Sequence, residues 1–172
     1  MYKIQKRNII KSERFDIIED TISKDGKLAP YSYVTIGTGI SIIPFIDDQH
    51  VLVLKEYRHP ITSWQYEFPS GGIDKGEKPI DAAKRELLEE TGYGTQDIQY
   101  LGFTYPSFGS TNEKIHLFAS KVKKVSAPHR EILEEINPEI ITIENLEEMI
   151  KNNQFAHGAG EVAWLKWKLK SN

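Results

Sequence analysis

Residues 71–93 have the sequence GGIDKGEKPIDAAKRELLEETGY, and they contain the clearest helix signal in the chain. The hydrophobic period becomes helical over residues 78–90. Pro79 suits the first helical turn, where its missing N–H costs nothing, and Gly92 suits the left-handed conformation that follows a last turn. The segment therefore predicts a Gly-rich turn that leads into one helix.

The predicted helix carries three glutamates on one face. Glu86 and Glu90 are one turn apart, and Glu89 follows Glu86 by three residues. Like charges at these spacings repel one another, and Arg85 and Lys84 give only partial relief. We therefore expect a cation to neutralise this face.

The chemistry of the donors indicates which cation this would be. Carboxylate oxygens without cysteine or paired histidine select a hard ion, and Mg²⁺ binds through a few carboxylates while it also takes phosphate oxygens of a substrate. The alternative reading is a solvated acidic helix face, which is the usual meaning of such a run. The preceding turn Ser70-Gly71-Gly72 and the additional acid Glu77 favour the metal site.

Length and composition exclude several classes of protein. The chain has 172 residues, 39% of them hydrophobic, which suits one compact domain with at most a small appendage. Its 22 basic and 25 acidic residues give a net charge of −3, which argues against nucleic acid as the main partner. The absence of cysteine excludes disulfides and thiolate metal sites and is typical of a reducing compartment, so we expect a cytoplasmic protein. No run approaches the roughly 18 to 20 apolar residues of a membrane-spanning helix, and we expect no membrane partner and no signal peptide.

The order of the other elements predicts the fold class. Strands are expected at 13–22 and 31–36 around the hairpin turn Lys24-Asp25-Gly26-Lys27, then at 40–46 and 50–57. After the helix we expect three more strands, at 98–103, 115–122 and 139–143. Two more helices are expected at 145–151 and 160–170. This order favours an α+β fold, an α/β/α sandwich, over a helical bundle or an all-β barrel. Residues 1–38 have too few apolar side chains to be stable alone, so they form an N-terminal antiparallel β arm attached to a domain of residues 39–172.

The segment in which Gly71 and Glu77 precede the run Arg85-Glu86-Leu87-Leu88-Glu89-Glu90-Thr91-Gly92 resembles the Nudix box of the Nudix hydrolases. All fixed polar positions and both fixed glycines match, and Tyr93 stands where the family usually has an aliphatic residue. The resemblance implies the Nudix fold with a mixed β-sheet and a metal-dependent pyrophosphohydrolase. It implies that Glu86, Glu90 and the backbone carbonyl of Ser70 bind the metal, that Glu89 binds or orients it, that Arg85 orients the glutamates, and that Glu77 supports the site. The implied ion is Mg²⁺, with Mn²⁺ as the alternative.

Two further segments resemble the branch that cleaves ADP-ribose and related nucleoside diphosphate sugars. Residues 52–58, LVLKEYR, and 64–72, WQYEFPSGG, are similar to the "QYR … E-x-PAG" run of that branch. The resemblance implies that Arg58 binds the diphosphate and that Glu67 binds substrate. It also implies a homodimer in which the N-terminal arm contributes to the subunit contact and to the substrate pocket.

The segment 105–113, YPSFGSTNE, is similar to the "SPG-x-S-x-E" loop of this branch, which makes Glu113 the expected general base. Phe108 replaces the proline that ADP-ribose enzymes usually carry, which leaves other nucleoside diphosphate sugars open as substrates. The five histidines show no ligand spacing and are interpreted as surface or packing residues.

The expected function is hydrolysis of the diphosphate linkage of ADP-ribose or a related nucleoside diphosphate sugar, which gives a nucleoside monophosphate and a sugar phosphate. One alternative is hydrolysis of nucleoside triphosphates or dinucleoside polyphosphates. The other is a module that binds nucleotide sugars without cleaving them.

Overall fold

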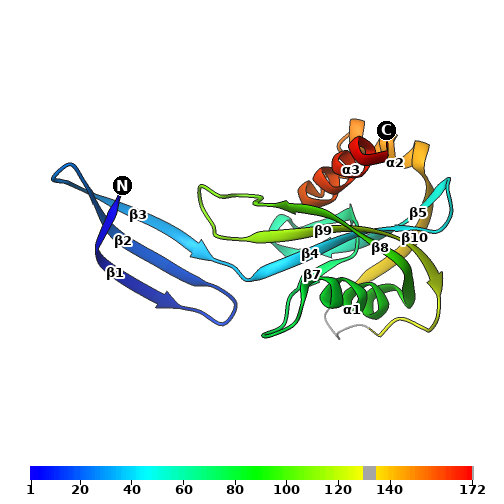
Figure 1. Cartoon of the computed structure of the whole chain (residues 1–172), viewed down its shortest axis with the longest axis horizontal. Coiled ribbons are helices and arrows are strands. Elements are labelled where there is room, and N and C mark those ends of the chain that lie inside the picture. Colours follow the sequence, from blue (N-terminus) through cyan, green and yellow to red (C-terminus); the bar gives the residue numbers. More distant parts are fainter. Residues whose placement is uncertain (130–134, 172) are drawn as a thin grey trace. The chain divides into compact units, whose positions relative to one another are not determined.

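The computed structural model describes residues 1–129 and 135–171, and its internal contacts divide the chain into two units. The first unit combines Met1–Thr38 with Tyr105–Lys114, and the second combines Gly39–Thr104 with Ile115–Asn172. The expected domain of residues 39–172 included the loop 105–114, whereas the contacts of that loop group it with the N-terminal arm. The two units are described separately below (Figure 1).

The first unit is a three-stranded antiparallel sheet of β1 (Lys3–Lys11), β2 (Asp16–Lys24) and β3 (Lys27–Thr35). The expected hairpin turn joins β2 to β3, with Asp25 and Gly26 at φ angles of 52° and 75°. Asparagine, aspartate and glycine tolerate this left-handed backbone, which explains the turn at this point in the sequence. The sequence did not predict β1, in which every residue is exposed.

The loop 105–114 is attached to the last strand of the arm by three hydrogen bonds. The Val34 N–H donates to the Ser110 carbonyl at 2.9 Å, and the Tyr31 hydroxyl donates to the Gly109 carbonyl at 3.1 Å. The Ile36 N–H donates to the side-chain oxygen of Asn112 at 2.8 Å. The segment that contains Glu113 is therefore ordered by the arm.

The second unit is built on a seven-stranded sheet. Five of its strands are hydrogen-bonded in the order β10-β5-β4-β9-β8, while β6 pairs with β5 and β7 pairs with β4. Its strands are β4 (Thr38–Phe45), β5 (His50–Arg58), β6 (Ser63–Glu67), β7 (Ser70–Gly72), β8 (Tyr93–Thr104), β9 (Lys114–Lys124) and β10 (Ile136–Thr142). A short 3₁₀ turn, His59–Ile61, connects β5 to β6. The sequence did not predict β6 and β7.

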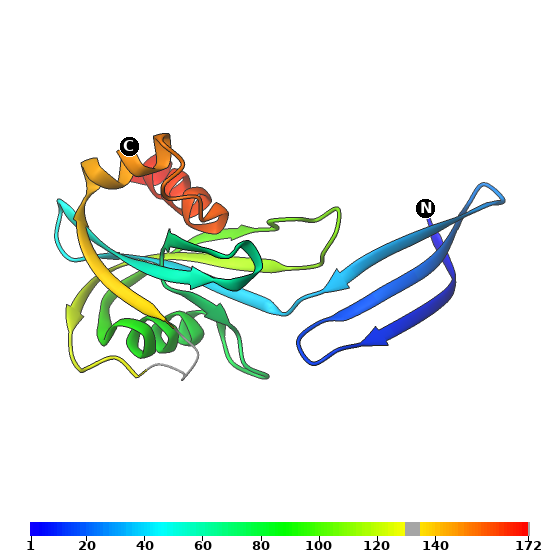
Figure 2. The same cartoon turned by 180° about the vertical axis from the view of Figure 1, so that it is seen from behind.

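Helices cover both faces of this sheet (Figures 1 and 2). α1 (Pro79–Thr91) packs Ala82, Ala83 and Leu87 on one face, in a core that also contains Ile40 and Ile42. α2 (Ile143–Lys151) and α3 (Gly158–Ser171) pack on the opposite face, in a larger core. The predicted α+β class with α/β/α layers is confirmed, and the predicted helices differ from the observed ones by one or two residues at most of their ends.

The strand β8 lies at one end of the path of paired strands. Two lysines of α3 reach it, and Lys166 Nζ donates to the Phe103 carbonyl at 2.9 Å while Lys170 Nζ donates to the Tyr100 carbonyl at 3.1 Å. Gly102, between these carbonyls, has a φ of 116°, where a side chain would be strained. The helix α3 therefore packs on the sheet and also satisfies backbone acceptors of its edge. Within the described residues, no helix is both long and apolar enough to cross a membrane.

Candidate active site

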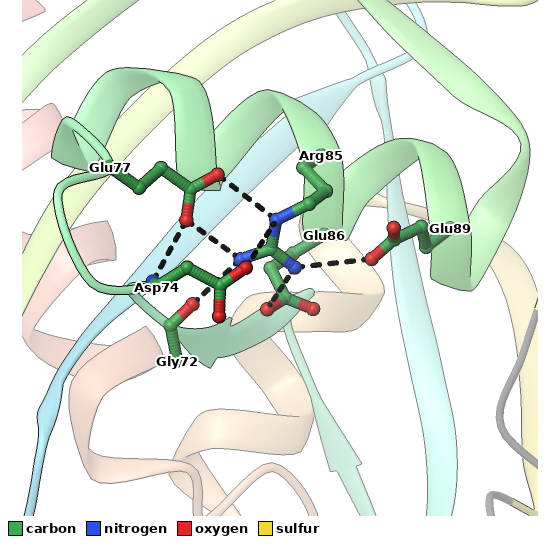
Figure 3. Close-up of polar contacts among 6 residues, drawn as sticks. All are labelled: Gly72, Asp74, Glu77, Arg85, Glu86 and Glu89. Carbon is green, nitrogen blue, oxygen red and sulfur yellow. Dashed lines mark hydrogen bonds and ion pairs between the residues drawn. The ribbon is translucent and has the colours of Figure 1, made fainter.

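Arg85, at the middle of α1, is the centre of a cluster of carboxylates (Figure 3). Its Nε and Nη2 donate to the two carboxylate oxygens of Glu77 at 3.0 and 2.9 Å. Its Nη1 donates to Glu86 at 2.8 Å and to Glu89 at 3.2 Å, and its Nη2 also donates to the Gly72 carbonyl at 2.9 Å. One guanidinium thus joins the Gly-rich turn to two glutamates of the helix.

This arrangement shares one positive charge among three carboxylates. The hydrogen bonds from Arg85, and then the N–H of Asp74, hold the pKa of Glu77 below its ordinary value. The same carboxylates raise the pKa of Arg85, which stays charged. Arg85 contacts Glu86 and Glu89, but its single positive charge is shared among three carboxylates, so it relieves their repulsion only in part. In the part of the chain that the structure describes, no three acids or histidines are already grouped so closely that they could hold a metal ion.

The carboxylate of Glu86 lies directly against the backbone of Gly71. A Cβ atom at position 71 would come within 2.1 Å of the Glu86 carboxyl carbon. A side chain at position 71 would therefore displace the Glu86 carboxylate from its place against the turn. Glu86 therefore lies next to Gly71, which directly follows Ser70. Ser70 is paired with Ser41 in the antiparallel contact between β7 and β4.

Glu90 is the buried member of the helical glutamates, with 6% of its surface exposed. It lies close enough to Arg58 to contribute to the pKa of that guanidinium. The helix α1 therefore directs Glu86 and Glu89 toward the Arg85 cluster and Glu90 toward a second arginine.

This second cluster lies on the β5–β6 hairpin. Arg58 Nη2 and Nε donate to the two oxygens of Glu67 at 2.6 and 3.2 Å, and Arg58 Nη1 lies 3.0 Å from Glu56 Oε1. The alternation of side chains along β5 places Leu54, Glu56 and Arg58 on one face, and the register with β6 adds Glu67 to it. Both glutamates are buried, with 9% and 5% exposed. Burial, and then a hydrogen bond with Glu67, raises the pKa of Glu56 to about 8.

His157 is a neighbour of this cluster that the sequence did not single out. Its Nδ1 accepts a hydrogen bond from the Phe68 N–H at 3.3 Å. Burial, and then the charge of Arg58, lowers the pKa of His157 to about 4, so the imidazole is neutral at pH 7. Its interpretation as a surface or packing residue missed its electrostatic coupling to Arg58 and Glu56. No spacing in the sequence relates these residues, because His157 comes from the loop before α3.

Glu113 belongs to the first unit. Its N–H donates to the Thr111 hydroxyl at 3.3 Å, and partial burial raises the pKa of its carboxyl group. A proton acceptor with a raised pKa suits general base chemistry. The structure brings the other predicted residues together in the second unit, namely Ser70, Glu86, Glu89 and Arg85 in one group and Arg58, Glu67 and Glu90 in another.

The donor set fits a hard divalent cation. It consists of the carboxylates of Glu86, Glu89 and Glu90 and backbone oxygens of the adjacent turn, with no sulfur or histidine among the predicted ligands. The close approach of Glu86 to Gly71 leaves no space for a side chain between carboxylate and turn. A hollow lined by Phe45, Asp97 and Trp167 contains none of these residues and is not part of this site.

Comparisons with known proteins agree with this geometry. The sequence model of the NUDIX domain family matches residues 35–157 of the chain. The chain is 29% identical to an ADP-ribose pyrophosphatase of Bacillus subtilis over 149 residues, which cover 86% of this chain and 80% of that protein. It is 40% identical to the ADP compounds hydrolase NudE of Escherichia coli over 62 residues, 36% of this chain and 33% of the relative. A crystal structure of an ADP compounds hydrolase superposes with a TM-score of 0.82 at 22% identity and covers 96% of this chain and 94% of that one, which shows a common fold. The resemblance found in the sequence is confirmed, and the chain belongs to the NUDIX domain family.

Proposed function

We propose that this protein is a metal-dependent pyrophosphohydrolase that cleaves the diphosphate linkage of ADP-ribose or a related nucleoside diphosphate sugar. The products would be a nucleoside monophosphate and a sugar phosphate, which for ADP-ribose are AMP and ribose 5-phosphate. The proposal depends on one observation. A partly exposed guanidinium, Arg58, is fixed by the buried Glu67 and is electrostatically coupled to Glu90, an expected metal ligand. The similarity to an ADP-ribose pyrophosphatase of Bacillus subtilis and to the ADP compounds hydrolase NudE of Escherichia coli supports the substrate class.

Glu86, Glu89, Glu90 and the Ser70 carbonyl would hold Mg²⁺, with Mn²⁺ as the alternative ion. When bound, the metal polarises the diphosphate and lowers the pKa of an attacking water. Arg85 orients Glu86 and Glu89 through the hydrogen bonds described above, and Glu77 fixes Arg85 in turn. Arg85 thereby keeps these carboxylates aligned before a metal ion enters.

Arg58 and Glu67 act together in substrate binding. Arg58 donates to Glu67 through Nε and one N–H of Nη2, and its Nη1 forms an ion pair with Glu56, which leaves N–H groups on Nη1 and Nη2 for a ligand. With 38% of its side chain exposed, Arg58 can direct these N–H groups to a phosphate oxygen. Glu113 would accept the proton of the attacking water, which the raised pKa of its carboxyl group supports.

The N-terminal arm supports a homodimer. Large apolar side chains are exposed on its strands, namely Ile4, Ile9, Ile10, Ile17, Leu28 and Tyr31. A small sheet with exposed apolar side chains is stabilised when another surface covers it. We therefore assign the arm, residues 1–38, to dimerisation and to the substrate pocket. The composition without cysteine and with a net charge of −3 supports a cytoplasmic protein whose substrate is a small molecule and not a nucleic acid.

The test is turnover of a substrate panel by the purified protein with Mg²⁺, with Mn²⁺ and with a chelator. The panel contains ADP-ribose, other nucleoside diphosphate sugars, nucleoside triphosphates and dinucleoside polyphosphates, and the products are identified by chromatography. We expect nucleoside diphosphate sugars to be cleaved fastest and the chelator to abolish turnover. Cleavage of triphosphates alone would reject the proposed substrate class, and binding without turnover would reject catalysis.

Two variants test the assigned residues. Glu90→Gln removes the charge of a metal ligand with little change in shape, and we expect about a 100-fold or greater loss in kcat. Glu139→Gln, on β10, is the matched control because Glu139 is outside the site and accepts a hydrogen bond from Tyr66. Full activity of Glu90→Gln would refute the metal assignment.

A further inference from the structure

The Arg58 cluster contains one carboxyl group more than its charge requires. Glu67 already makes two hydrogen bonds with Arg58, and Glu56 adds a second buried carboxyl group 3.0 Å from the same guanidinium. If both glutamates were ionised, the cluster would carry a net negative charge next to the expected path of an anionic diphosphate. Such a charge would oppose the binding role assigned to Arg58.

The shared position of the two glutamates resolves this conflict. Both carboxyl groups are buried and lie against the same guanidinium, Glu56 at 3.0 Å from Nη1 and Glu67 at 2.6 and 3.2 Å from Nη2 and Nε. One guanidinium balances one negative charge, and two ionised carboxylates at one buried site would repel each other. One of the two groups must therefore carry a proton, as in other pairs of carboxyl groups that share a site.

The geometry indicates which group carries the proton. Glu67 accepts two hydrogen bonds from Arg58, at 2.6 and 3.2 Å, the paired geometry in which arginine binds a carboxylate. Glu56 has one contact with the guanidinium, at 3.0 Å, and is 9% exposed. Glu56 is therefore the acid and Glu67 the carboxylate.

We propose that Glu56 is a positioning residue, which as a neutral carboxylic acid donates a hydrogen bond to Glu67 and so fixes Arg58 in the orientation that binds the substrate phosphate. The inference adds a residue to the proposed function and depends on that function for its kinetic consequences. Glu56 touches neither substrate nor metal in this scheme, and it acts through Glu67 and Arg58. With the proton in place, the charges of Arg58 and Glu67 balance, and the free N–H groups of Arg58 remain available.

The charged neighbours on every side are consistent with a retained proton. Glu67 faces Glu56 from β6, Arg58 follows it on β5, and Glu90 of α1 is coupled to Arg58. His157, from the loop before α3, is neutral at pH 7 because its pKa is lowered to about 4, so it adds no positive charge that would help Glu56 to ionise. The raised pKa of Glu56, about 8, agrees with this arrangement.

The first experiment detects the proton without any turnover. Infrared spectra of the wild type and of Glu56→Gln are compared at about pH 7 and about pH 10 in the full-length protein. We expect a band of a protonated carboxyl group in the wild type at pH 7 that is absent in Glu56→Gln and disappears from the wild type at pH 10. If the band of the protonated carboxyl group were equally strong in the two proteins at pH 7, or absent from both, the proposal would be overturned, whatever the substrate of the enzyme is.

The second experiment measures kcat and KM for the preferred nucleoside diphosphate sugar, with saturating Mg²⁺, from about pH 6 to about pH 10. Glutamine keeps a neutral group that donates to Glu67, so Glu56→Gln should retain KM within about threefold at pH 7 and lack the rise in KM that the wild type shows above about pH 8. Glu56→Leu has no donor and should raise KM about tenfold at pH 7 with a smaller change in kcat. The control Glu139→Gln should follow the wild type at every pH.

The outcomes separate the two claims. If KM rose equally in Glu56→Gln and Glu56→Leu at pH 7, the role of Glu56 would be overturned. The same holds if KM of Glu56→Gln rose above about pH 8 as it does in the wild type. If the protein cleaved no diphosphate, the proposed function would fail, and the infrared comparison would still decide whether Glu56 holds the proton.

Discussion

The two arginine clusters of the second unit contain similar groups in different surroundings. Arg85 joins Glu77, Glu86 and Glu89 at the surface of α1, whereas Arg58 joins two buried glutamates on the β5–β6 hairpin. In the first cluster the pKa of Glu77 is lowered, so its ionised form is favoured. In the second, burial outweighs the arginine and raises the pKa of Glu56. An arginine beside a glutamate therefore does not by itself determine which way the pKa moves, because the loss of water can exceed the attraction between charges.

The largest effect on stability is expected from the removal of the buried cation. Arg58→Ala leaves Glu67 and Glu56 buried without this positive partner, and we expect a loss of about 2 to 3 kcal/mol of unfolding free energy at pH 8, less than for a fully buried pair because Arg58 is partly exposed. The loss should be smaller at pH 5, well below the raised pKa of Glu56, where that carboxyl group is neutral. Urea unfolding followed by circular dichroism measures both values. Lys121→Ala, which breaks the exposed pair with Asp48, is the control and should change little. A loss that did not depend on pH would contradict this account of the cluster.

The Arg85 cluster is expected to be most sensitive at Gly71. The Cβ of Gly71→Ala would displace the Glu86 carboxylate from its position against the turn, and we expect about a 100-fold loss in kcat with folding retained. Gly72→Ala is a matched control, because no atom lies within 4 Å of a Cβ at that position. Steady-state kinetics of the two variants test the comparison. Equal activities would show that the position of Glu86 does not matter.

The two clusters should give opposite slopes of stability against pH. The folded-state pKa of Glu56 is raised from 4.5 to about 8, so the folded protein holds a proton that the unfolded chain releases, and stability falls as the pH rises between these values. Glu77 has a lowered pKa, so its contribution is present above its ordinary pKa and is lost as the pH falls below it. In Glu56→Gln, we expect the loss between pH 5 and pH 8 to shrink by about 2 kcal/mol or less. Thermal unfolding at several pH values measures the slopes, and an unchanged alkaline slope in this variant would exclude Glu56 as its source.

The smallest effect is expected from Glu77→Gln. Glutamine can still accept one hydrogen bond from Arg85 but no longer provides a charge, so Arg85 should orient Glu86 and Glu89 less well. We expect kcat/KM to fall about tenfold, as for other residues that orient metal ligands. The same assay with increasing Mg²⁺ checks the reason, because the loss should diminish at high metal concentration. A loss that high Mg²⁺ leaves unchanged would assign Glu77 a different role.

The sequence predicted the parts of the site that depend on local spacing. Pro79 and Gly92 mark the ends of α1, and the helical period places Glu86, Glu89 and Glu90, so the bounds of the helix were predicted within one residue. The contacts of Arg85 with Glu77 depend on the path of the turn, which no periodicity describes.

The Arg58 cluster shows what sequence reasoning missed. The alternation of Leu54, Glu56 and Arg58 on one face of β5 was a signal that could have identified Glu56 as a buried neighbour of Arg58. Nothing comparable was available for His157, because its place beside Phe68 results from packing between distant segments. The strand β1 was missed because its exposed residues alternate charge with isoleucine and have no buried face.

The contacts of α3 with the edge of the sheet have a consequence for association between molecules. An edge strand with unused carbonyl groups can act as a template on which a strand of another chain adds, the first step of aggregation. On β8, Lys166 and Lys170 already occupy the carbonyls of Phe103 and Tyr100, and they bring positive charge to the place where a foreign strand would approach. The helix α3 therefore makes this part of β8 less available for pairing with a strand of another molecule.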